Sequence, residues 1–163
     1  AMVSIIFEHG GTLDKFLGDG ILATFGSIEL KSELNGDHAR RSLEAALAMR
    51  ARLRQWNTER ERRGKTALHQ GSGLHTGPAI VGNVGVAERL EYTVIGDTVN
   101  LASRVEGLCK SLKSDLLVTA EVLDGLTPDD PLRNRFESIG AQAIRGRQRP
   151  VTLLRPRVRL AKT

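Results

Sequence analysis

The feature that most constrains the fold is the alternation of two helical segments with short apolar runs that end at glycines. From Asp37 to about Trp56, apolar residues recur at helical spacing, and Thr98 to Cys109 shows the same pattern over a shorter length. The apolar runs outside these segments are short enough to be single strands. Strands that alternate with helices in this way predict an α+β fold, in which helices pack on a mostly antiparallel sheet.

The spacing of apolar residues and turn residues also predicts the individual elements. Further helices are expected at residues 1–9, ended by Gly10-Gly11, and at 121–126. We expect Asp37 or a neighbouring residue to cap the first of the two longer helices, and Asp97 to cap the second. The three strands between those helices are expected to pair consecutively and antiparallel. The expected strands are 13–17, 21–25, 68–75, 79–84, 89–95, 116–119, 136–144 and 151–154, and residues 27–36 are expected to form a loop.

Length and composition are those of one globular domain. The chain has 163 residues, of which 40% are hydrophobic and 26% are charged, so we expect a single domain over residues 1–163. No run of eighteen apolar residues and no export leader is found in this sequence. Cys109 is the single cysteine, which excludes an internal disulfide and fits a reducing cytoplasm.

The positive charge of the chain limits the choice of partners. The formal net charge is +5, and much of the excess lies in the late stretch "IRGRQRPVTLLRPRVRL". A basic segment of this kind can bind nucleic acid, lipid headgroups or polyphosphate, or it can be a solvated edge strand. Aromatic residues make up only 4% of the chain and none lies among these arginines, so we expect no nucleic-acid partner.

Two polar residues on the second long helix are candidates for binding a nucleotide. Asn100 and Arg104 are four residues apart, so they share one face of the helix. A guanidinium offers a planar fork of donors to a phosphate, and an amide can both donate to and accept from a ribose. An ordinary polar helix surface has the same pattern, so the spacing alone does not decide.

The stretch "KFLGDG" places one carboxylate at a glycine-flanked corner. Asp19 suits a tight turn between two strands, and it also suits a metal ligand at the edge of a sheet. Lys15, four residues earlier, is expected on the same face of the strand, as a donor to a base or as a solvated lysine. His75 lies in "GLHTGPAIVGNVG", where no second His or Cys stands at ligand spacing, so we interpret it as a structural histidine.

Taken together, these segments resemble a known family. The ordered set "HGGTLDKFLGDGILATFG", "GLHTGPAIVGNVG" and "YTVIGDTVNLASRVEGL" resembles the catalytic domain of class III nucleotidyl cyclases, the adenylyl and guanylyl cyclases. The resemblance runs from about Glu8 to Leu108, and "IRGRQRPVTLLR" resembles the closing strand pair of the family. It implies a ferredoxin-like cyclase fold that here lacks its first strand.

The resemblance implies roles for the residues that hold the nucleotide. Asp19 matches the second of two aspartates that hold Mg²⁺ or Mn²⁺ against the phosphates, in a two-metal site. Lys15 matches the position that reads the purine, and a lysine can donate to the adenine N1 acceptor, which indicates ATP. Thr93 matches its partner in purine recognition. Because a hydroxyl can both donate and accept, Thr93 indicates adenine less decisively than an aspartate would.

The remaining matched residues imply catalysis at a dimer interface. Asn100 and Arg104 match the pair that positions the ribose and stabilises charge on the α-phosphate. Arg145 falls near the position that contacts the terminal phosphates, with Arg147 as a rival. In this family the metal aspartates and the other site residues come from different subunits of a head-to-tail dimer. A homodimer, or a pair with a related cyclase domain, is therefore expected.

Two departures from the family pattern limit these expectations. The first metal aspartate belongs to a strand motif that would precede this sequence, and Asp14 does not lie in a motif that replaces it. We therefore expect a truncated domain with little or no activity as it stands, and membrane attachment only through regions absent here. Gly71 stands where some relatives have an arginine, which makes the pyrophosphate contacts harder to assign.

Three other functions fit parts of the sequence. A catalytically silent regulatory or dimerisation domain is disfavoured because Lys15, Asp19, Asn100 and Arg104 are all present. A guanylyl cyclase is disfavoured by Lys15, where a glutamate would accept from guanine. A diguanylate cyclase needs an acidic pair in its turn motif, which "LGDG" lacks.

Overall fold

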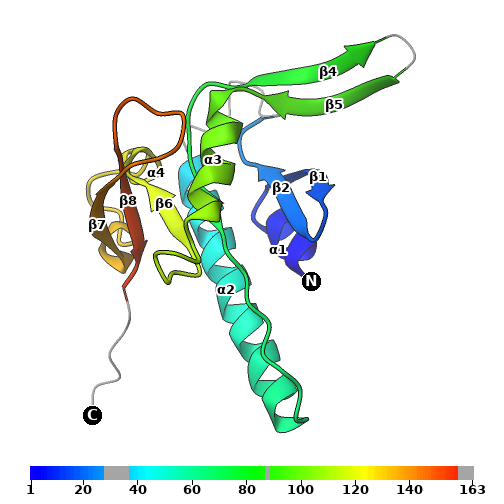
Figure 1. Cartoon of the computed structure of the whole chain (residues 1–163), viewed down its shortest axis with the longest axis vertical. Coiled ribbons are helices and arrows are strands. Elements are labelled where there is room, and N and C mark those ends of the chain that lie inside the picture. Colours follow the sequence, from blue (N-terminus) through cyan, green and yellow to red (C-terminus); the bar gives the residue numbers. More distant parts are fainter. Residues whose placement is uncertain (28–36, 87–88, 158–163) are drawn as a thin grey trace.

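The computed structural model describes residues 1–27, 37–86 and 89–157, and it confirms the α+β class (Figure 1). The expected loop at 27–36 lies outside the described residues except for Ser27. The elements are α1 (Met2–Glu8), β1 (Thr12–Leu17), β2 (Gly20–Thr24), α2 (His38–Arg62), β3 (Gly73–Leu74), β4 (Ile80–Val86), β5 (Arg89–Ile95), α3 (Asp97–Gly107), β6 (Leu117–Thr119), α4 (Ala120–Asp124), the 3-10 helix η1 (Arg133–Arg135), β7 (Phe136–Gln142) and β8 (Val151–Pro156).

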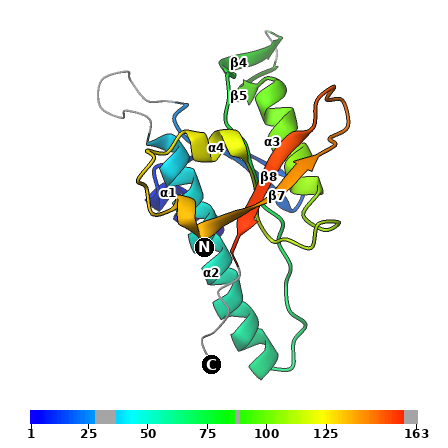
Figure 2. The same cartoon turned by 90° about the vertical axis from the view of Figure 1, so that its left-hand side faces the viewer.

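The core forms on both faces of a four-stranded sheet with the strand order β3-β6-β8-β7. The β3–β6 pair is parallel and the other two pairs are antiparallel. Because successive strand residues point to opposite faces, Val118 packs with α2 and α4, while Leu117 packs with α3. Leu43 of α2 and Val105 of α3 are fully buried in these two clusters. The helices therefore sandwich the sheet, and α3 lies on the face opposite to α2 and α4 (Figure 2).

The expected consecutive pairing is wrong for the first strand between the long helices. β3 has only two residues and pairs parallel with β6, with Gly73 opposite Leu117. The reason is a close approach to α3: a Cβ on Gly73 would lie 2.3 Å from the amide nitrogen of Glu106 and 2.6 Å from the carbonyl oxygen of Ala102. β3 is thus held between α3 and β6, and the chain leaves the sheet before β4 begins.

The other two strand pairs are antiparallel hairpins, as expected, but they lie outside the central sheet. β1 and β2 pair antiparallel around a turn in which Gly18 has φ +64°. β4 and β5 pair from Ile80–Ile95 at the base to Val86–Arg89 at the tip. The β4–β5 hairpin projects from the body of the molecule, as Figure 1 shows.

The helix ends differ from the sequence prediction in two respects. Asp97 is the first residue of α3 rather than its cap, since the N-cap position falls on Gly96, whose φ is +146°. Asp37 is the N-cap residue of α2, but its side chain makes no capping hydrogen bond. Asp97 is therefore available for an ion pair, described below.

Helix α2 continues beyond the predicted end at Trp56. The Asn57 amide donates to the carbonyl oxygen of Leu68 and accepts from the Leu68 N–H, both at 2.8 Å. These bonds hold the returning segment 63–72 along the helix, which explains an extension that apolar periodicity does not reveal. In the described part of the chain, no helix is both long and apolar enough to cross a bilayer.

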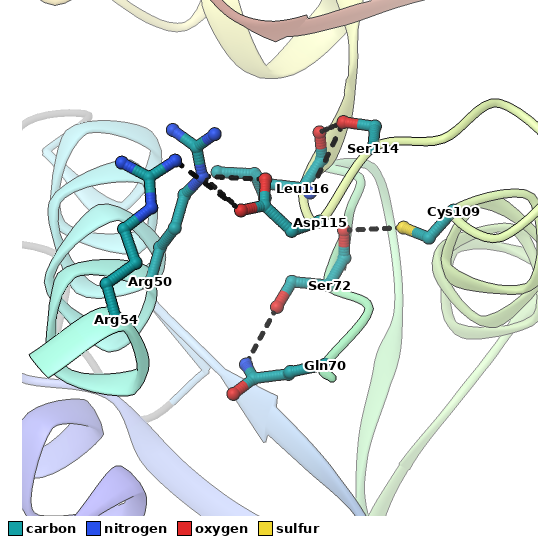
Figure 3. Close-up of polar contacts among 8 residues, drawn as sticks. All are labelled: Arg50, Arg54, Gln70, Ser72, Cys109, Ser114, Asp115 and Leu116. Carbon is teal, nitrogen blue, oxygen red and sulfur yellow. Dashed lines mark hydrogen bonds and ion pairs between the residues drawn. The ribbon is translucent and has the colours of Figure 1, made fainter. Parts of the chain in front are cut away.

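Polar contacts around Asp115 join the elements on either side of the sheet (Figure 3). The Arg50 Nε atom of α2 lies 2.6 Å from both carboxylate oxygens of Asp115, and Arg54 adds a guanidinium nitrogen at 3.8 Å. On the other side, the Cys109 thiol donates to the carbonyl oxygen of Ser72 at 3.4 Å. Burial raises the pKa of Cys109 to about 11, so this cysteine stays a neutral thiol at physiological pH.

Replacing Gly73 with alanine tests the close contact between β3 and α3. We expect Gly73→Ala to lower the free energy of unfolding by about 2–3 kcal/mol, because the added methyl group meets helix backbone that cannot give way. Gly107→Ala is the matched control, since a Cβ there meets nothing within 4 Å. Urea unfolding measures the free energy of unfolding of both variants, and equal values would contradict this account.

Candidate functional site

The six residues predicted to bind substrate or metal fall in three regions of the structure. Lys15 and Thr93 lie on β1 and β5, near the base of the projecting hairpin. Asn100, Arg104 and Arg145 lie on α3 and on the β7–β8 loop. Asp19 lies in the turn between β1 and β2, beyond the end of the strand that carries Lys15.

Asp14 connects the two residues predicted to read the purine. Its Oδ2 atom accepts a hydrogen bond of 2.8 Å from the Thr93 hydroxyl, and its Oδ1 atom accepts one of 3.1 Å from the Val94 N–H. The Lys15 Nζ atom lies 3.8 Å from the same Oδ2 atom and 3.2 Å from Glu91 Oε2. The structure therefore brings Lys15 and Thr93 to the same carboxylate oxygen of Asp14.

A β-bulge aims Asp14 at β5. Leu13 pairs with Ala23 and Lys15 pairs with Leu22, so Asp14 is an extra residue between two successive pairs. A bulge of this kind re-aims a side chain and breaks the alternation of faces. Asp14 and Lys15 can therefore both reach β5 although they are adjacent in sequence. No feature of the sequence signals a bulge here, and sequence analysis gave Asp14 no role in the site.

The predicted common face of Lys15 and Asp19 is wrong. β1 ends at Leu17, so Asp19 lies in the turn and not on the strand that carries Lys15. The alternation rule applies only within a regular strand, and here the bulge and the turn both interrupt it.

On α3, Asn100 and Arg104 are both exposed, while Leu101 and Val105 of the same helix are buried in the core. The Arg104 guanidinium lies against Gly146 of the β7–β8 loop, where a Cβ would come within 2.9 Å of Arg104 Nη1. Gly146 also has φ +77°, in the region that favours glycine. The loop and the helix thus meet at the side chain predicted to stabilise the α-phosphate.

The two arginines predicted as alternative contacts of the terminal phosphates both lie on the β7–β8 loop, but their surroundings differ. Arg147 forms an ion pair of 2.6 Å with Asp97 at the start of α3. Arg145 is exposed and has no ion pair within the described part of the chain. Arg147 therefore holds the loop on α3, whereas Arg145 keeps its charge available for a ligand.

His75 has the environment of a structural histidine, as expected. It follows β3, and its Nδ1 atom lies 2.9 Å from the hydroxyl of the buried Thr119. Burial lowers the pKa of His75, and nearby Arg147 lowers it further, whereas Glu121 raises it. The net downward shift keeps the imidazole neutral at physiological pH.

Asp19 is the residue that the family resemblance predicts to hold a metal ion. Its side chain is exposed at the turn, and its carboxylate has no hydrogen bond or ion pair within residues 1–27, 37–86 and 89–157. Carboxylate oxygens suit Mg²⁺ and Mn²⁺, so Asp19 fits such an ion as one ligand. The described residues contain no cluster of three or more His, Cys, Asp or Glu that could hold a metal. The Asp14 carboxylate faces β5 instead, where its oxygens accept from Thr93 and Val94.

The sequence is similar to those of named cyclases. A family model described as "Adenylate and Guanylate cyclase catalytic domain" matches residues 4–154. An adenylate cyclase of Anabaena cylindrica is 41% identical over 130 residues, which cover 77% of this chain and 24% of that protein. Adenylate cyclase 1 of Rhizobium meliloti is 36% identical over 119 residues, which cover 73% of this chain and 17% of that protein. The chain thus spans about a quarter or less of these relatives.

Solved structures show the same fold. The adenylyl cyclase CyaB from P. aeruginosa has a TM-score of 0.78 and 28% identity, with 96% of this chain and 76% of that chain covered. The guanylyl cyclase Cya2 has a TM-score of 0.75 and 31% identity, with 95% and 74% covered. The family match covers nearly the whole chain, and these solved structures share its fold. The chain belongs to the family of adenylate and guanylate cyclase catalytic domains.

Proposed function

We propose that this chain is an adenylyl cyclase domain that converts ATP to 3′,5′-cyclic AMP and pyrophosphate. The observation that carries the proposal is the convergence of Lys15 and Thr93 on Asp14, because it makes one purine-reading unit of residues from two strands. The relatives named adenylate cyclase support the same substrate. Since the fold is shared with both adenylyl and guanylyl cyclases, the choice of ATP rests on Lys15 and Thr93.

In the proposed reaction, the ribose 3′-oxygen attacks the α-phosphorus and loses its proton to solvent, while the bond from the α-phosphorus to the bridging oxygen breaks. Asn100 orients the ribose for this attack, and Arg104 stabilises the charge that develops on the α-phosphate. Arg145 neutralises the departing pyrophosphate. A bound Mg²⁺ or Mn²⁺, with Asp19 as one ligand, would lower the charge of the phosphates and favour ionisation of the 3′-hydroxyl.

We also propose that two chains share each site in a head-to-tail dimer. The family resemblance implies this arrangement, and within the described residues no hydrogen bond or ion pair links Asp19 to α3. The projecting hairpin offers an apolar surface for a second copy. Its exposed members include Ile80 at 67%, Val86 at 64%, Leu90 at 57% and Tyr92 at 60%.

Two expectations from the sequence stay predictions. One is weak activity of residues 1–163 alone, because a site with a single metal aspartate holds its ions less well. The other is a cytoplasmic location. Activity is therefore best measured on the 163-residue chain beside a version extended upstream by the family's first metal-binding strand.

Removing the Arg104 guanidinium tests the proposed activity. We expect Arg104→Ala to lower kcat for cyclic AMP formation from ATP with Mn²⁺ by about 100-fold, since charge on the α-phosphate then loses its donor. Arg62→Ala, at the exposed end of α2, is a control of the same chemistry outside the site. Cyclic nucleotide production from ATP and from GTP measures the effect. Product from GTP alone would favour a guanylyl cyclase, and an unchanged kcat in Arg104→Ala would contradict its role.

The contact between Arg104 and Gly146 gives a second test. Gly146→Ala and Gly140→Ala both place alanine at positive φ, at +77° and +81°, so each costs about 1 kcal/mol of stability. Only at residue 146 does the new methyl group meet the Arg104 guanidinium; at residue 140 it meets nothing within 4 Å. We expect kcat to fall about tenfold in Gly146→Ala because Arg104 is displaced. Equal kcat values in the two variants would show that this contact does not position Arg104.

A further inference from the structure

The hydrogen bond between Thr93 and Asp14 has a direction that the chemistry of the two groups dictates. An ionised carboxylate can only accept, so the Thr93 hydroxyl must donate its single proton to Asp14 Oδ2 at 2.8 Å. The second carboxylate oxygen is also occupied, since Val94 donates its N–H to Oδ1 at 3.1 Å. Both partners are nearly removed from solvent: Thr93 is 6% exposed and the Asp14 side chain is 8% exposed.

A hydroxyl whose proton is used in this way can only accept from a further ligand. The exocyclic amino group of adenine is a donor, whereas the O6 atom of guanine is an acceptor. Thr93 held by Asp14 therefore complements adenine and opposes guanine. A threonine without such a neighbour would turn its proton toward either base.

We infer that Asp14 fixes the hydrogen-bond direction of Thr93 and thereby makes this hydroxyl select adenine. Asp14 is then a positioning residue for substrate specificity, and the bulge in β1 is what aims it at β5. The inference rests on the proposed function, since it takes Thr93 and Lys15 as the residues that read the purine. The inference gives Asp14 a role that the sequence pattern did not. It also explains how the Thr93 hydroxyl can accept a hydrogen bond from adenine as a carboxylate would.

The substitution Asp14→Asn reverses the direction of the bond. The Val94 N–H can only donate, so the oxygen of the new amide stays on Val94 and its NH₂ group faces Thr93. That NH₂ group donates to the Thr93 oxygen and releases the hydroxyl proton. Thr93 can then donate to guanine O6, so the variant should accept GTP better and ATP less well.

The experiment compares ATP with GTP in the wild type and in Asp14→Asn, in the chain extended upstream. Two ratios are measured: kcat/KM for cyclic nucleotide formation with Mn²⁺, and Kd from titration of each nucleotide. We expect the preference for ATP over GTP to fall about tenfold or more in Asp14→Asn, the effect of reversing one buried hydrogen bond. In a Thr93→Val background, Asp14→Asn should leave the ratio unchanged.

Matched variants separate this role from a structural one. Glu91→Gln also removes one negative charge beside Lys15, 3.2 Å from its Nζ atom, and should not change the ratio. Thr93→Ser keeps the hydroxyl and should keep the preference for ATP. If Asp14 merely holds β1 on β5, Asp14→Asn weakens ATP and GTP equally, and this result overturns the inference.

The outcomes also separate the inference from the proposed function. A wild type that binds ATP over GTP but forms no cyclic AMP contradicts the proposed activity, and the Kd ratios then decide whether Asp14 sets the preference. A wild type that prefers GTP while Thr93 still donates to Asp14 overturns the inference.

Discussion

The close contact between β3 and α3 is the constraint on which the position of the α3 residues depends. Only a glycine at position 73 lets the helix backbone at Glu106 approach the strand so nearly. Once α3 lies there, Val105 is buried against the sheet, and Arg104 projects to the β7–β8 loop, where Gly146 has no side chain to obstruct it. Two glycines far apart in sequence thus fix the position of the Arg104 guanidinium.

The contact between β1 and β5 also positions site residues, but it depends on a charged side chain and not on close packing. A single carboxylate, Asp14, holds Thr93 and Val94 by hydrogen bonds and lies beside Lys15. The bulge in β1 makes this possible, because a regular strand would turn Asp14 and Lys15 to opposite faces. The two parts of the site are therefore built by different means, since α3 depends on small residues and β5 on a buried polar contact.

Local patterns predicted much of this fold. The two long helices, the β1–β2 hairpin and the late strands β7 and β8 follow from apolar spacing and turn residues. The pairing of β3 with β6 could not be predicted in this way, because the contact of Gly73 with α3 joins residues distant in sequence. Sequence alone likewise could not show the ion pair with Asp97 that distinguishes Arg147 from Arg145. The role of Asp14 was missed because a bulge leaves no periodic signal.

In the proposed dimer, the Asp19 turn of one copy and the α3 residues of another complete each site. The most direct measurement mixes two inactive variants, Asp19→Asn and Arg104→Ala, of the chain extended upstream, and follows cyclic AMP formation from ATP. If copies exchange at random, half of the dimers contain one chain of each variant. Each of these mixed dimers has one intact site, with Asp19 from one chain and Arg104 from the other, and one site that lacks both residues. We therefore predict recovery to about a quarter of wild-type activity. No recovery above the separate variants, with dimers shown to exchange, would contradict the shared site.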